Sequence, residues 1–316
     1  MFVPEVVTFG ESMALMMPSG TKGIEYSAHF HKSFGGAESN VAIGIARLGH
    51  RAGWFGRLGK DPLGRTILKQ IRGEGVDVSR AQLADDAPTG LMIREVVSGK
   101  SSVYYYRKYS AASRMKPEHL DEDYIRQAKI LHVTGITPAL SDSCRETVRA
   151  AVRIAKKHGV KVSFDPNLRL KLWSLEEARK VLLPLAEEAD YFLPGLDELK
   201  LLYETDDFED IVNRLNRLPA VTILKGADDK TYVLEKGELK AVPYFKAEQV
   251  VDTVGAGDGF CAGFLTGLLK GYSHEEAVRL GNLIGSLVIQ MEGDWEALPT
   301  WDQVDSILHN RAHIER

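Results

Sequence analysis

Strand-like and helix-like segments alternate regularly from about residue 129 onward. The apolar run KILHVTG precedes the helical pattern SCRETVRAAVRIAKKHG, and VKVSFDP precedes SLEEARKVLLPLAEEA. The rhythm continues through DYFLPG, LDELKLLYE and AVTILKG, and EVVTFG and ESNVAIGIARLG near the start also fit it. Strands that alternate with helices form a mostly parallel sheet covered on both faces. We therefore predict an α/β fold whose ligands bind at the carboxyl ends of the strands.

Two stretches break this rhythm. Residues 88–110 hold two strand-like runs joined by SGK, the pattern of a hairpin, and residues 13–36 are extended and rich in turns. Together they predict a small antiparallel sheet that stands off the main body as a lid. The chain shows no internal repeat and no linker. We expect residues 1–316 to form one domain with this lid.

Charge and cysteine usage exclude several classes of protein. The formal net charge is −4 and the basic residues are interspersed with acids, so no nucleic-acid surface is expected. The two cysteines, Cys144 and Cys261, are far apart and have no metal-binding spacing. The first residues lack the pattern of a signal peptide, and no apolar run is long enough to span a bilayer. We predict a cytoplasmic protein without a membrane partner.

Small residues and one amide mark the segment FGGAESNVA. Gly35 and Gly36 precede a helix start, where bare backbone lets a ligand approach closely, and Asn40 can reach a hydroxyl group. The alternative is a tight turn followed by an ordinary helix cap.

Two further clusters of polar residues each contain an arginine. In YYYRKYS, Tyr105 and Arg107 are two residues apart and share a strand face, which suits a hydroxylated anion. In SFDPNLR, Asp165, Asn167 and Arg169 follow a strand, and the guanidinium can grip a carboxylate or a phosphate. The alternatives are a polar outer face for the first cluster and a structural loop for the second.

The strand ILKG ends in Lys225 and Gly226. The lysine is placed to meet a nucleotide phosphate or is simply exposed, and the sequence leaves both open. The nearby Lys230-Thr231 pair is not a phosphate-binding loop of the Walker type, because the required glycines do not precede it.

A carboxylate stands inside a glycine-rich helix start in DTVGAGDGF. Gly255, Ala256 and Gly257 expose backbone N–H groups that suit an anion, yet Asp258 follows directly. Phe260 occupies the place of the third glycine of a dinucleotide fingerprint, so that motif is excluded. The conflict is resolved if a phosphoryl group is attacked here, with Asp258 taking the proton of the attacking hydroxyl. A purely structural helix start is the alternative.

These segments together resemble a known family. GGAESNVA, DTVGAGDGFCAGFL and the strand pair between them are similar to the ribokinase-like (phosphofructokinase-B-type) carbohydrate kinases over nearly the whole chain. Within the family the chain most resembles kinases of 2-keto-3-deoxygluconate, through GGAE, YYRKYSAAS, DPNLRLKLW and GDWEALP. The resemblance implies a three-layer α/β/α domain. It also implies ATP-dependent phosphorylation, with Mg²⁺, of the terminal C6 hydroxyl to give 2-keto-3-deoxy-6-phosphogluconate.

The resemblance also implies a role for each motif residue. Asp258 becomes the general base and the GAG segment before it the anion hole. The implied sugar contacts are Gly35, Gly36, Asn40, Tyr105, Arg107, Asn167, Arg169, Asp258 and Asp294. The implied nucleotide contacts are Asn167, Arg169, Lys225, Gly226, Gly255, Ala256, Gly257 and Asn282.

One segment departs from the family pattern. Many members carry Asn-x-x-Glu at a strand end, where this chain has PGLDE; Gly195 replaces the asparagine and Glu198 remains. The resemblance therefore implies only a contact from Glu198 to the metal through water.

Two other functions remain open at this point. A neutral-sugar kinase such as a fructokinase offers no charge to Arg107 and Arg169, which argues against it. A non-catalytic sugar- or nucleotide-binding protein has no need of the carboxylate in GAGD. The sequence does not separate 2-keto-3-deoxygluconate from its C4 epimer, 2-keto-3-deoxygalactonate. A lid sheet with one open face predicts a homo-oligomer.

Overall fold

A mostly parallel sheet forms the centre of the computed structural model, which describes residues 3–20, 22–227 and 229–309. Within these residues the sheet has eight strands in the order β14-β13-β12-β11-β10-β9-β1-β4. All neighbours from β12 to β4 are parallel, whereas β13 and β14 form an antiparallel edge. The strands are β1 (Val6–Phe9), β4 (Ala52–Phe55), β9 (Ile130–Thr134), β10 (Lys161–Asp165), β11 (Tyr191–Phe192), β12 (Val221–Ala227), β13 (Lys230–Glu235) and β14 (Glu238–Pro243).

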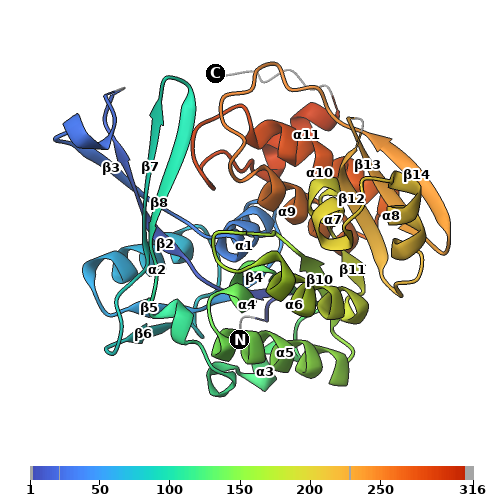
Figure 1. The fold of residues 1–316 in the computed structure, drawn as a ribbon, viewed down its shortest axis with the longest axis horizontal. Helices are drawn as coiled ribbons and strands as arrows, with labels where there is room; N and C mark the ends of the chain where they lie inside the picture. Colours follow the sequence, from blue (N-terminus) through green and yellow to red (C-terminus); the bar gives the residue numbers. More distant parts are fainter. Residues whose placement is uncertain (1–2, 21, 228, 310–316) are drawn as a thin grey trace.

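Helices cover both faces of this sheet (Figure 1). Successive strand residues alternate between two cores, so that Val6 packs into one and Val7 into the other. The first core is shared with α1 (Ala37–Arg47), α2 (Pro62–Gly73), α9 (Ala256–Leu269), α10 (His274–Val288) and α11 (Trp301–Leu308). The second is shared with α3 (Glu122–Ile125), α4 (Ile136–Ala139), α5 (Asp142–Lys157), α6 (Leu175–Glu188), α7 (Leu196–Tyr203) and α8 (Phe208–Leu215). The predicted α/β fold with a mostly parallel sheet is confirmed.

Small residues fix the position of α9, which carries the glycine-rich motif. A Cβ atom on Gly263 would lie 2.9 Å from the Cα of Gly281 in α10, and one on Gly44 in α1 would lie 2.6 Å from the Cβ of Ala262. Such distances require a shift of the backbone, so α9 packs more closely on both helices than larger residues allow. Close packing on two sides at Ala262 and Gly263 fixes the middle of α9 against the main body.

A second, smaller sheet stands beside the main body in the order β3-β2-β7-β8 (Figure 1). Its strands are β2 (Met13–Pro18), β3 (Phe30–Gly35), β7 (Leu91–Val97) and β8 (Lys100–Tyr106). The pairs β2–β3 and β7–β8 are antiparallel, and the two pairs join through β2 and β7, which run parallel. The β7–β8 hairpin turns at Ser98 and Gly99, whose φ angles are 51° and 76°. We call these four strands the small sheet.

The remaining elements are short. Strands β5 (Arg57–Gly59) and β6 (Gln82–Ala84) pair in parallel. The short 3₁₀ helices are η1 (Ile24–Tyr26), η2 (Ala112–Arg114) and η3 (Pro117–His119). Among the described residues, no helix has both the length and the apolar character needed to cross a membrane.

Candidate active site

A cavity of about 770 Å³ lies between the small sheet, the carboxyl ends of the central strands and the start of α9. All sixteen residues that the sequence analysis assigned to the site line this one cavity. They come from segments as far apart as β3 and the stretch after α10. The fold therefore gathers every predicted motif in one place, as expected for the strand ends of a parallel sheet.

The start of α9 lies at the floor of the cavity, and we call residues 255–257 the anion cradle, after the role that we propose for them. Gly255 precedes the helix with φ of 77°, in the left-handed region that favours glycine. A Cβ atom there would also lie 2.2 Å from the carbonyl oxygen of Asp294. The first N–H groups of a helix have no acceptor within the helix, and the helix dipole favours negative charge beside them. Gly255, Ala256 and Gly257 line the cavity at this point, so the cradle faces the space that a ligand would fill.

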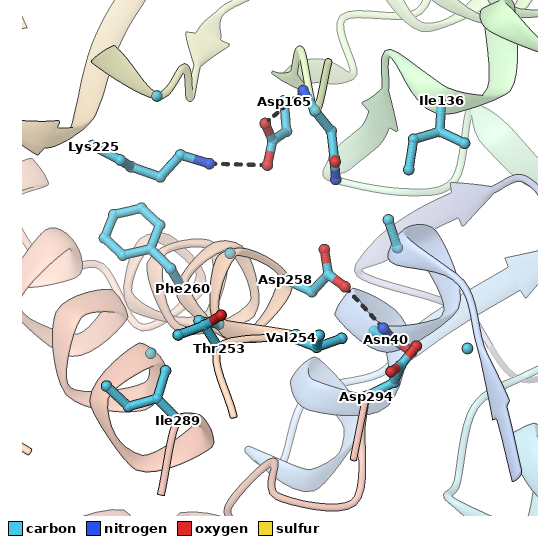
Figure 2. Close-up of a pocket in the computed structure, with 18 of the residues that line it drawn as sticks. Asn40, Ile136, Asp165, Lys225, Thr253, Val254, Asp258, Phe260, Ile289 and Asp294 are labelled. Carbon is cyan, nitrogen blue, oxygen red and sulfur yellow. Dashed lines mark hydrogen bonds and ion pairs between the residues drawn. The ribbon is translucent and has the colours of Figure 1, made fainter. Parts of the chain in front are cut away.

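Asp258 lies directly beside this cradle and is held by Asn40. The Asn40 Nδ2 donates to Asp258 Oδ2 at 2.8 Å (Figure 2). Enclosure by the protein raises the pKa of Asp258 to about 7, a net value that already includes the lowering effects of the Asn40 hydrogen bond and of the Arg169 charge. The amide nitrogen of Asn40 is thus committed to the carboxylate. Its Oδ1 is buried without a partner among the described residues and can still accept a hydroxyl.

Arg107 is held by an acid that the sequence analysis missed. Its Nε donates to Glu11 Oε2 at 2.7 Å, its Nη2 contacts the same oxygen, and Ser110 Oγ donates to Glu11 Oε1 at 2.7 Å. The Glu11 side chain is only 1% exposed. The guanidinium lies 5.4 Å from the Tyr105 ring centre, as the shared strand face predicts. Glu11 follows β1 in the short segment GES, where a buried acid leaves no sequence signal besides its position.

Arg169 differs from Arg107 because no ion pair holds it within the described part of the chain. Its Nη1 donates to the carbonyl of Leu168 at 3.3 Å, and the side chain is exposed at the cavity edge. The preceding Asn167 has φ of 38°, and its N–H donates to Asp165 Oδ1 at 3.1 Å. Arg169 lines the cavity, so its charge is available to an anionic ligand.

Lys225 is paired rather than simply exposed. Its Nζ lies 3.0 Å from Asp165 Oδ2 (Figure 2). The Cys261 Sγ lies 3.4 Å from the same oxygen. Burial alone lowers the pKa of Lys225, but the nearby Asp165, Cys261 and Glu198 together outweigh it and raise the pKa above its usual value. The lysine therefore stays charged at the cavity wall. Gly226 follows with φ of 82°, and its N–H donates to the Tyr244 hydroxyl at 2.6 Å.

Two predicted site residues use their polar atoms inside the protein. Glu198 accepts the N–H of Leu168 at 2.6 Å and that of Gly195 at 2.7 Å, and burial raises its pKa. The Oδ1 of Asn282 accepts from Thr231 at 2.7 Å, while its Nδ2 donates to main-chain carbonyls of β14. Both residues shape the wall of the cavity by holding backbone segments in place.

Asp294 occupies the other end of the cavity from Lys225 (Figure 2). Burial, and then the charge of Glu296, raise its pKa to about 7. Glu296 also accepts the N–H groups of Asp294 and Trp295 at 3.0 and 3.1 Å, which fixes this turn. A Cβ atom on Gly35 would lie 1.8 Å from Asp294 Oδ2, so glycine at position 35 makes room for the carboxylate.

Phosphoryl transfer to a hydroxyl group is the chemistry that an anion cradle beside a carboxylate of raised pKa can perform. Comparison with known proteins agrees with this class. Residues 3–301 match the pfkB family of carbohydrate kinases, and the chain belongs to that family. It is therefore a phosphotransferase of the kind that acts on a hydroxyl group.

Several proteins to which the chain is similar are kinases of particular sugar acids. The chain is 40% identical over 309 residues to a 2-dehydro-3-deoxygluconokinase of Bacillus subtilis, covering 96% of this chain and 95% of that one. It is 32% identical to a 2-dehydro-3-deoxygalactonokinase of Haloferax volcanii, covering 96% of each. The crystal structure of a 2-dehydro-3-deoxygluconokinase of Thermotoga maritima has a TM-score of 0.88 at 27% identity, covering 97% of this chain and 98% of that one.

Proposed function

We propose that this protein is an ATP-dependent sugar-acid kinase that phosphorylates the C6 hydroxyl of 2-keto-3-deoxygluconate. The observation that carries the proposal is the position of Asp258, beside the anion cradle of α9 and in the same cavity as Arg107 and Arg169. The 40% identity to a 2-dehydro-3-deoxygluconokinase supports the choice of sugar acid. The product is 2-keto-3-deoxy-6-phosphogluconate.

The proposed transfer requires one bond to form and one to break. The C6 oxygen of the sugar bonds to the γ-phosphorus of ATP, and the bond from that phosphorus to the bridging oxygen of ADP breaks. Asp258 takes the hydroxyl proton, since it lies within the cradle region and its pKa is near neutral. The N–H groups at the start of α9 stabilise the charge that develops on the transferred group.

The nucleotide would lie on the Lys225 side of the cavity, against Gly226 and the Asn282 wall. Among the described residues, no group of three or more His, Cys, Asp or Glu side chains could hold a metal ion. Mg²⁺ commonly keeps several waters and binds through substrate phosphates with one or two carboxylates, so the cavity fits a metal that arrives with ATP. When bound, Mg²⁺ would neutralise phosphate charge. Any contact from Glu198 would run through water.

The two arginines favour an acidic sugar over a neutral one. Arg107 is largely neutralised by Glu11, so Arg169 is the side chain with charge to spare for a carboxylate. Asn40 Oδ1, Asp294 and Tyr105 offer acceptors and a phenol to the sugar hydroxyls. Gly35 and Gly36 let the sugar lie close to the backbone.

Three further assignments belong to this proposal. Residues 1–316 act as one kinase domain in which the segments 13–36 and 88–110 form a lid over the sugar. The outer face of the small sheet, where Tyr104 and Tyr106 are 47% and 61% exposed, packs against another copy in a homo-oligomer. The protein works in the cytoplasm.

An ATP-consumption assay with product identification tests the function. The substrates are 2-keto-3-deoxygluconate, 2-keto-3-deoxygalactonate and fructose, each with ATP and Mg²⁺. We expect the first sugar acid to be turned over with the highest kcat/KM and the phosphate to be on C6. Preference for fructose would instead make the protein a neutral-sugar kinase, and no turnover of any sugar would make it a binding protein.

A further inference from the structure

A buried ion pair joins the small sheet to the segment that leads into the anion cradle. Arg94 lies in the middle of β7, and its Nη2 is 2.6 Å from Asp252 Oδ2. The two side chains are only 10% and 7% exposed. Arg94 also donates from Nε to Ser101 Oγ of β8 at 3.2 Å. The planar guanidinium therefore spans from the small sheet to the main body.

Asp252 in turn organises the turn before α9. Its Oδ1 accepts the N–H of Val254 at 3.1 Å, and its own N–H donates to the carbonyl of Ile289 at 3.2 Å. Gly255 follows at once and begins the cradle. The side chain of Asp252 is thus held from two directions, by its own turn and by Arg94. Removal of Arg94 would leave a buried carboxylate without its cation, at the start of the segment that must present N–H groups to the phosphoryl group.

We infer that Arg94 is a positioning residue through which the small sheet controls the geometry of the anion cradle. With the small sheet over the sugar, the guanidinium clamps Asp252 and holds residues 252–257 in the arrangement that binds the transferred phosphoryl group. With the small sheet displaced, the clamp is released and the cradle loses that restraint. The inference rests on the proposed function, in which the small sheet closes over the sugar acid.

The clamp has a chemical consequence for ATP. Water competes with the sugar hydroxyl for the phosphoryl group, and an enzyme that closes around its substrate suppresses this hydrolysis. A cradle that becomes fully ordered only through Arg94 reaches its active geometry when the sugar is already bound. The ion pair therefore couples the presence of the acceptor to activation of the donor.

Steady-state kinetics of Arg94→Met with 2-keto-3-deoxygluconate test this role. Methionine keeps much of the length and removes the charge. We expect kcat to fall on the order of 10- to 100-fold, as for a misplacement of about 1 Å in catalytic geometry, while KM for the sugar changes less than threefold. Arg94→Lys should recover part of the loss, because it keeps the charge without the fork. Lys100→Met, at the exposed tip of the same hairpin, should behave as the wild type.

A double-mutant cycle with Asp252→Asn separates the clamp from general destabilisation. We expect Arg94→Met and Asp252→Asn together to lower kcat no further than the more severe single change, because both remove the same restraint. Multiplicative losses in the double variant would overturn the inference. So would an Arg94→Met variant that folds and keeps kcat within twofold of the wild type.

Hydrogen exchange distinguishes failure of the clamp from failure of the lid. In the wild type, 2-keto-3-deoxygluconate should protect both residues 88–110 and residues 250–258. In Arg94→Met it should still protect 88–110 but no longer 250–258. If 250–258 gain equal protection in the variant, the clamp is wrong and the lid stands. If 88–110 gain none in the wild type, the lid proposal fails and the clamp fails with it.

Discussion

In the proposed mechanism, Asp258 acts as a general base directly beside an anion site. A carboxylate that is fully charged would repel a phosphoryl group, whereas one that is always protonated could not accept a proton. Enclosure raises its pKa to about 7, and the Asn40 amide keeps the pKa from rising further. The side chain is thus placed to change protonation state near neutral pH, which is the range in which a general base works best.

Replacement of this carboxylate should abolish turnover without loss of nucleotide binding. We expect Asp258→Asn to lower kcat about 10²- to 10⁴-fold, the usual contribution of general-base catalysis. Affinity for ATP should stay the same or increase, because a negative charge beside the phosphates is removed. The measurements are initial rates and calorimetric titration with ATP, with Asp142→Asn on the exposed start of α5 as the control. A variant with more than about a tenth of the wild-type kcat would contradict the role of Asp258.

The pH dependence of the reaction should report the same group. Since the base must be deprotonated, kcat/KM for the sugar acid should fall about tenfold per pH unit below an apparent pKa near 7. Asn40→Ala removes a hydrogen bond to the charged form, so it should raise the pKa of Asp258 and move the profile to higher pH. Titration of ATP itself is common to both proteins and cancels in the comparison. An unchanged or acid-shifted profile in Asn40→Ala would be inconsistent with this assignment.

The two arginines should respond differently to truncation. Arg169→Ala removes an unpaired charge, so we expect binding of the sugar acid to weaken roughly 10- to 150-fold, or about 1.5–3 kcal/mol, with little change in Tm. Arg107→Ala should also weaken binding but lower Tm by several degrees, because Glu11 is left buried without its cation. Substrate titration and thermal unfolding of both variants measure the two effects. Equal Tm losses would show that Arg169 too is structural.

At the scale of elements, α9 and the small sheet differ in how firmly they are packed against the main body. Helix α9 is held on two sides by close contacts of Ala262 and Gly263 with α1 and α10, so the middle of the helix is a fixed part of the main body. The small sheet has its own minor core of Met13, Leu15 and Met92. It joins the main core through Ala14 and Phe34, and the ion pair of Arg94 with Asp252 also links it to the main body. A thin sheet with a minor core is better suited to move than a helix packed on two sides.

The small sheet should close in response to sugar rather than to nucleotide. It carries Tyr105 and lies against Arg107, whereas the proposed nucleotide contacts belong to the main body. A ligand shifts an equilibrium only by its different affinity for the two states. Amides of residues 88–110 should therefore gain more protection from hydrogen exchange with 2-keto-3-deoxygluconate than with a non-hydrolysable ATP analogue. Equal protection by the nucleotide alone would show that these strands are not a sugar-driven lid.

At the scale of the whole molecule, two buried acids of the site lower the free energy of unfolding at neutral and higher pH. Asp258 and Asp294 both have a pKa raised to about 7 in the folded state. Between about pH 4 and pH 7 the folded protein binds more protons at these groups than the unfolded chain does, so their contribution to stability falls as the pH rises. Glu5, whose pKa is lowered to about 2, has the opposite effect: its contribution to stability is present at neutral pH and is lost at low pH.

Removal of one carboxyl group whose pKa is raised should therefore stabilise the ligand-free protein. The stabilisation should appear only at high pH. We expect Asp294→Asn to raise Tm relative to the wild type at pH 8, with the gain shrinking toward zero near pH 4, where both states carry a protonated group. Thermal unfolding of the two proteins across this range measures the difference, and groups such as Glu5 cancel in it. A gain that is constant with pH would indicate a packing effect instead.

The sequence by itself determined the class of fold and the location of the cradle. Both depend on local patterns: the alternation of strands and helices sets a parallel sheet, and GAGD places bare backbone and a carboxylate at one helix start. These patterns act over a few residues, where the spacing of side chains already decides what an element can bury or expose.

Only the tertiary structure decided which polar groups pair with one another. Glu11 holds Arg107 across 96 positions of the chain, and Arg94 of the small sheet reaches Asp252 in the segment before α9. Glu198, for which the resemblance implies a contact with the metal through water, also accepts the backbone N–H groups of Leu168 and Gly195. A charged group that is removed from water must find a partner wherever the fold supplies one, and the choice depends on distances between elements that no local spacing records.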